Sequence, residues 1–123
     1  MAINWEMLKA RYLRSELMAQ LESLVLNLTR IQTLVENHDG EAVAKHLVRE
    51  SQFFIEWTVS SLDLEQNMIL AMDLADLQRQ LSVWKLDWSE CWENLQQRQQ
   101  IAQLSKQWCD RLGSFYLPLI QAS

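Results

Sequence analysis

Only two glycines and one proline interrupt this chain of 123 residues. β-Sandwiches and barrels need turn residues at intervals of about eight to twelve positions, which three breakers do not supply. Because Gly40, Gly113 and Pro118 are the only strong breakers, most of the chain is predicted to form long helices. The length and the 49% hydrophobic and 22% charged content are typical of one ordinary globular domain. The sequence therefore predicts an all-α fold in a single domain spanning residues 1–123.

The first predicted helix spans about residues 5–37. Apolar residues recur in it at alternating steps of four and three, which is the spacing of a heptad seam. The apolar members of the seam are Ile3, Met7, Ala10, Leu17, Leu21, Leu24, Leu28, Ile31 and Val35. Asn4 is the predicted N-cap, and the turn residues 37–40 end the helix. Arg14 interrupts the seam, where it either reaches solvent at the bundle edge or sets the packing register.

Three further helices are predicted after this turn. The second begins after Asp39 and extends to near Ser60, where β-branched and hydroxyl-bearing residues lower the helix propensity. The third begins at Asp63, which opens a capping box. A short turn at 85–87 separates the third helix from a fourth. The alternative is one helix over 63–112, but at about 75 Å it would be too long for the other helices to cover.

The C-terminal segment is predicted to leave the helix. Gly113 suits the left-handed position that follows a helix end. The apolar tail 114–123 contains Pro118, which disfavours a regular helix, so we expect the tail to fold back over the bundle or onto a second subunit. The predicted architecture is an elongated antiparallel bundle of four helices with a short apolar C-terminal tail.

Charge and composition exclude several classes of function. The net charge is −5, and residues 36–76 carry nine acids against two bases, Lys45 and Arg49. An acidic segment disfavours binding to phosphate backbones, so no nucleic-acid partner is expected. No apolar run reaches the roughly 18 residues of a membrane span. Cys91 and Cys109 form no CxxC pair, and a reducing cytoplasmic location is expected.

The strongest candidate for chemistry is a polar pair on the second predicted helix. His46 and Glu50 are four residues apart and therefore share a helix face with apolar neighbours. An imidazole and a carboxylate together are able to bind a metal or share a proton, whereas the alternative is an ordinary ion pair at the core edge. A bundle metal site draws ligands from several helices, and the only other histidine is His38. No cofactor and no metal are therefore expected.

Three of the six tryptophans form the most distinctive pattern in the chain. Trp84, Trp88 and Trp92 recur every four residues and lie on one face of a helix. Tryptophan is enriched at protein interfaces and lines pockets for flat ligands, but bundles also bury aromatic side chains in their cores. The sequence leaves these three alternatives open.

These patterns support two hypotheses for function. The first is a non-enzymatic protein-interaction or regulatory module that forms a homodimer, with another protein as a further possible partner. It follows from the first predicted helix, which carries Leu8, Leu13, Met18, Val25, Leu26 and Leu34 beside its seam. A twofold dimer would cover this additional apolar surface. The second hypothesis is a small-ligand-binding or catalytic bundle that uses a tryptophan-lined interior with His46 and Glu50.

Overall fold

The computed structural model describes the backbone of residues 4–122 and the side chains as far as Tyr116. Helix accounts for 91% of the structure and no strand occurs among these residues, so the all-α prediction is confirmed. The helices are α1 (Trp5–Arg14), α2 (Leu17–Asn37), α3 (Glu41–Ser61), α4 (Leu64–Leu86), α5 (Trp88–Glu93) and α6 (Leu95–Ala122).

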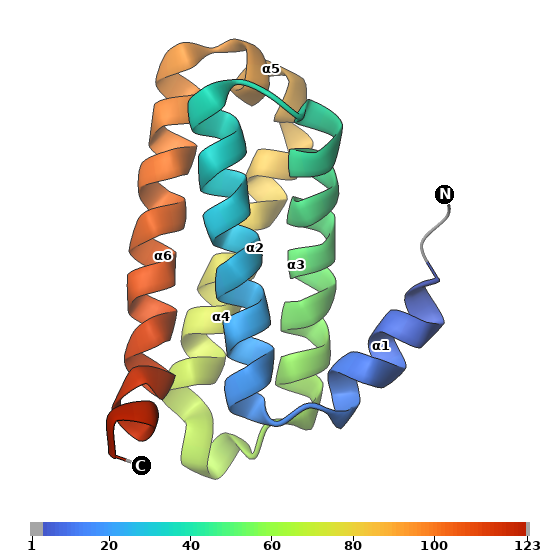
Figure 1. Ribbon diagram of the computed structural model, residues 1–123, viewed down its shortest axis with the longest axis vertical. Helices are drawn as coiled ribbons and strands as arrows, with labels where there is room; N and C mark the ends of the chain where they lie inside the picture. Colours follow the sequence, from blue (N-terminus) through green and yellow to red (C-terminus); the bar gives the residue numbers. More distant parts are fainter. Residues whose placement is uncertain (1–3, 123) are drawn as a thin grey trace.

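Four long helices make up the body of the molecule. In Figure 1, α2, α3, α4 and α6 lie side by side along the long axis, and each runs opposite to the one before it. The short helix α5 crosses one end of this bundle, between α4 and α6, whereas α1 projects obliquely beside α3. The prediction of four helices is therefore incomplete, because the described chain contains two additional short ones.

The heptad seam forms the core where the sequence predicted it within α2. Its residues from Leu21 to Val35 are at most 2% exposed. They share one hydrophobic core with an apolar stripe on α4 that is equally buried and consists of Leu70, Leu74, Leu77 and Leu81. The turn at 37–40 is also confirmed, since His38 and Gly40 adopt left-handed backbone conformations between α2 and α3. Asp63 caps α4 as predicted and accepts a hydrogen bond from the backbone N–H of Glu65.

The prediction of one helix over residues 5–37 is wrong, because the chain breaks at Ser15. Ser15 and Glu16 have extended ψ angles of 149° and 158°. The side-chain amide of Gln20 donates to the carbonyl oxygens of Tyr12 (3.0 Å) and Ser15 (3.2 Å), which holds the corner between α1 and α2. An uninterrupted seam would place Arg14 in the core at high cost, whereas the break leaves its side chain exposed.

The predicted fourth helix is divided into two. A turn at Asp87 confirms the break expected at 85–87, but α5 ends after six residues, at Glu93. Asn94 is extended, and its side-chain oxygen accepts from the backbone N–H of Gln97 at 3.0 Å, so it caps the start of α6. Arg98 is buried there, and its guanidinium donates to the carbonyl oxygen of Trp92.

The C-terminal prediction is also wrong, because α6 continues through Gly113 and Pro118. A glycine inside a helix costs about 1 kcal/mol, and a proline removes one helical hydrogen-bond donor. Against these costs, the continued helix buries the side chain of Tyr116 and packs Phe115 against the core. The side chains beyond Tyr116 lie outside the described residues, and so does the predicted packing of the tail.

Tyr12 anchors α1 to helices α2 and α3 of the bundle. Its hydroxyl lies 2.6 Å from Thr58 Oγ1 and donates to the Gln20 carbonyl at 3.3 Å, while its ring stacks on Phe54 with centroids 4.3 Å apart. Burial raises the pKa of Tyr12 to about 12 from its ordinary value of 10.0, although the hydrogen bond with Thr58 lowers it. The buried phenol therefore holds its proton more tightly than a phenol in the unfolded chain.

This shift predicts a loss of stability at alkaline pH that is specific to Tyr12. Because the folded pKa is raised, the contribution is intact below pH 10.0 and is lost as the pH rises to about 12. A shift of this size corresponds to roughly 2–3 kcal/mol. In urea unfolding, Tyr12→Phe should be less stable than the wild type at neutral pH by about 1 kcal/mol. The difference should reverse in this alkaline window, and parallel pH profiles for the two proteins would contradict the assignment.

Candidate functional site

The three tryptophans singled out from the sequence belong to the core. Trp84 lies on α4, whereas Trp88 and Trp92 lie on α5, and they are 3%, 3% and 5% exposed, respectively. The rings of Trp88 and Trp92 stack with centroids 5.8 Å apart. In this conformation their buried indoles offer a partner almost no surface, and the structure favours the core alternative.

His46 and Glu50 do come together as their spacing predicts. His46 Nε2 lies 3.3 Å from Glu50 Oε2, and the other Glu50 oxygen accepts from Asn27 Nδ2 at 3.1 Å. The His46 ring packs beside Trp5, with centroids 5.7 Å apart. No group of three His, Cys, Asp or Glu side chains suited to a metal occurs in the described part of the chain. The His46–Glu50 pair on α3 thus contacts Asn27 on α2 and Trp5 on α1, and no third metal ligand joins it among the described residues.

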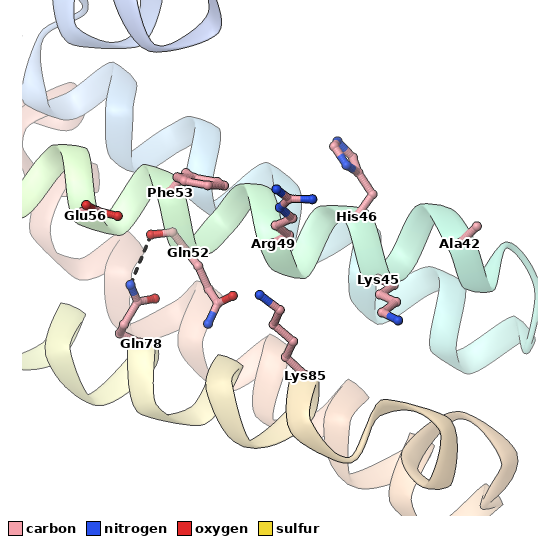
Figure 2. Close-up of a pocket in the computed structure, with 9 residues that line it drawn as sticks. All are labelled: Ala42, Lys45, His46, Arg49, Gln52, Phe53, Glu56, Gln78 and Lys85. Atoms are coloured by element: carbon pink, nitrogen blue, oxygen red, sulfur yellow. Dashed lines mark hydrogen bonds between the residues drawn. The ribbon is translucent and has the colours of Figure 1, made fainter. Parts of the chain in front are cut away.

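A basic groove between α3 and α4 is a feature that the sequence analysis missed. It encloses about 660 Å³, and three of its lining residues are the cations Lys45, Arg49 and Lys85. Figure 2 shows Lys45 and Arg49 on α3 and Lys85 on α4, while His46 points away from α4. The groove is lined by Ala42, Lys45, His46, Arg49, Gln52, Phe53, Glu56, Gln78 and Lys85. The two bases of the acidic segment thus share a groove with a third from a neighbouring helix.

The cations of this groove are held without carboxylate partners. Arg49 lies 5.3 Å from the ring centroid of Trp5 and 5.8 Å from that of Phe53. Across the described residues, none of the ion pairs involves Lys45, Arg49 or Lys85. An anionic group in the groove would therefore meet three cations, none of which is ion-paired with Glu56, the one carboxylate among the lining residues.

The solvent-facing side of α4 carries a second apolar stripe that the sequence analysis also missed. Ile69, Met72, Val83 and Leu86 point outward and are between 53% and 84% exposed. They lie opposite the stripe that α4 buries in the core. Asp76 and Arg79 occupy the middle of this exposed row and form an ion pair with each other. We refer to the six residues as the outer stripe: Ile69, Met72, Asp76, Arg79, Val83 and Leu86.

The apolar surface that the sequence assigned to a partner is mostly covered within the chain itself. Most of the apolar residues beside the seam of the first predicted helix pack against the core, namely Leu8, Met18, Val25 and Leu34. Only Leu13 and Leu26 of that set remain exposed. The physical reason is that α6, which is 28 residues long, and α3 both pack along α2, while α1 packs against α3. The exposed apolar surface is consequently concentrated on α4.

The two cysteines are not activated nucleophiles. Burial raises the pKa of the Cys91 thiol, and the nearby carboxylates of Asp87 and Glu90 raise it further. Burial also raises the pKa of Cys109, against the opposing effect of its contact with Thr29. Both thiols thus have less thiolate character at neutral pH than a free cysteine.

Comparison of the chain with protein-family models, with curated proteins and with solved structures returns no match. None of the helices within residues 4–122 is both long enough and apolar enough to cross a bilayer.

Proposed function

We propose that the chain is a non-enzymatic protein-interaction module that binds its partner through the outer stripe of α4. The observation that carries this proposal is the exposure of Ile69, Met72, Val83 and Leu86 on one face of one helix. These side chains form two apolar groups, one on each side of the Asp76–Arg79 pair, and grouped apolar side chains open to water mark interaction sites. A helix that is apolar on both faces is typical of a position between two packed layers.

The charges on α4 support the same proposal. Between Gln66 and Trp84 the only charged residues are Asp73, Asp76 and Arg79. Asp73 is buried and lies 2.7 Å from the Arg111 guanidinium of α6, so it is not part of the solvent face. The solvent face over this segment therefore carries one negative and one positive charge. A surface helix that needed only solubility would carry more charge.

Site-specific photo-cross-linking tests this proposal. A benzophenone amino acid placed at Met72 should give a discrete cross-linked product in the source cells, because the partner's side chains would contact this position. The same group at Gln107, an exposed position on α6, serves as the matched control and should give none. Equal labelling at the two positions, or no product from position 72, would contradict the proposal.

A second candidate function is the binding of a small anionic ligand in the basic groove. It is favoured by three cations that form no ion pair among the described residues and that line a space of about 660 Å³, and it replaces a tryptophan-lined interior as the ligand site. Titration with inorganic pyrophosphate, followed by backbone amide NMR, should shift resonances around Lys45, Arg49 and Lys85. Arg49→Gln should weaken these shifts, and uniform or absent shifts would exclude this candidate.

A further inference from the structure

The outer stripe of α4 has a spacing that reads the same from either end. Its successive members are three, four, three, four and three residues apart, from Ile69 to Leu86. Alternating steps of three and four define the contact seam of a coiled coil. Apolar residues occupy both ends of the seam and the Asp76–Arg79 pair occupies its centre. A symmetric seam of this kind is complementary to itself.

From this symmetry, and resting on the proposed function, we infer that the partner of the outer stripe is the α4 of a second copy of this chain, packed antiparallel. We place the twofold axis between Leu77 and Gln78. Each residue of one copy then faces a residue of the second copy, and the two residue numbers add up to 155. Ile69 then faces Leu86 of the second copy, and Met72 faces Val83. Asp76 faces Arg79 of the second copy, and the symmetry forms this contact twice.

The position of the two charges selects the antiparallel arrangement. In a parallel pair, Asp76 would face Asp76 of the second copy and Arg79 would face Arg79. Like charges held opposite each other at an interface are destabilising. The antiparallel arrangement instead places opposite charges together, so charge complementarity fixes both the direction and the register.

The backbone and the flanking residues of α4 permit this contact. The only non-helical angles inside α4 are at Asn67, before the stripe begins, so Ile69–Leu86 is regular helix about 25 Å long. Beside the stripe lies Ala75, which is small, uncharged and exposed. A small side chain at this position allows two helix backbones to approach closely.

Charge exchange at the centre of the stripe tests the inference. By sedimentation equilibrium in the micromolar range, the wild type should have twice the 14.5 kDa mass of one chain. Asp76→Arg alone and Arg79→Asp alone each place like charges opposite each other, and should weaken self-association about tenfold or more. Both side chains are more than half exposed, so neither variant should lose its helical fold.

Two complementary combinations make the test specific. The double variant Asp76→Arg/Arg79→Asp should recover self-association, and an equimolar mixture of the two single variants should form a heterodimer. Met72→Asp should abolish association, whereas Gln107→Asp on α6 should not affect it.

A wild type that remains monomeric, or that dimerises without any response to these variants, would overturn the inference. A monomeric purified protein that still cross-links through position 72 to a different protein in the source cells would overturn self-pairing alone. If the purified protein is monomeric and position 72 gives no cross-linked product in the source cells, the proposed function is contradicted as well.

Discussion

Leu24→Asp should prevent the chain from folding, whereas Leu26→Asp should leave its stability almost unchanged. Leu24 is fully buried in the seam of α2, and Leu26, two residues further along the same helix, is 60% exposed. Shortening a buried leucine to alanine alone costs about 3–5 kcal/mol. An unpaired buried carboxylate adds a large desolvation penalty, and the total approaches the whole stability of about 5–15 kcal/mol expected for a small domain.

Far-UV circular dichroism and urea unfolding distinguish the two variants. Leu26→Asp should remain within about 0.5 kcal/mol of the wild type, as is usual for an exposed position. It should also retain the self-association of the wild type, because Leu26 lies on α2 and not on the outer stripe. A folded Leu24→Asp protein, or a Leu26→Asp protein that no longer self-associates, would place the core or the interface elsewhere.

Trp88→Ala should strongly destabilise the fold. The side chain is 3% exposed and stacks on Trp92, so its removal leaves a cavity where α5 closes the bundle. Truncation of a buried tryptophan costs about 3–5 kcal/mol. The indole Nε1 of Trp88 has no hydrogen-bond acceptor among the described residues. Trp88→Phe should therefore lose no hydrogen bond and cost less than half as much as Trp88→Ala.

Thermal unfolding of both variants at several protein concentrations provides the measurement. If these tryptophans are core residues, Trp88→Ala lowers the melting temperature by a similar amount at every concentration. A variant with wild-type stability but weaker self-association would show that Trp88 lies at an interface instead.

The fold could be predicted from the sequence where apolar periodicity and capping residues agree. The seam of α2, the turn at 37–40 and the Asp63 cap each have a local signal, and each is present in the structure. The break at Ser15 has only an indirect signal, the cost of Arg14 in an apolar seam. The start of α6 has a direct one, because Asn94 followed by Gln97 resembles a capping box.

The C-terminal helix could not be predicted from local propensity. Gly113 and Pro118 both favour a helix end, but burial of neighbouring side chains against the bundle is a tertiary effect. Sequence-based reasoning weighs the breaker and does not include the packing that compensates for it. For this reason the sequence predicted a separate tail after Gly113, whereas in the structure α6 continues to Ala122.

The candidate surfaces were harder to predict than the core. His46 and Glu50 pair as their spacing indicates, since both lie on one helix. The basic groove depends on α4 bringing Lys85 beside α3, which only the tertiary arrangement determines. The outer stripe has a readable signal, because α4 repeats apolar residues on two opposite faces. Which of the two faces is buried follows only from the packing of the whole bundle.

Disulfide trapping across α4 is the most direct measurement of the proposed interface. Met72→Cys and Val83→Cys chains, mixed and oxidised, should form a covalent heterodimer, because antiparallel pairing places these positions opposite each other. Neither variant should cross-link to itself: equivalent positions lie about 16 Å apart along the helices, beyond the reach of a disulfide. The wild type, which contains Cys91 and Cys109, measures the background. Self-cross-linking of Met72→Cys as efficient as that of the mixture, or no cross-link in the mixture, would contradict antiparallel pairing through the outer stripe.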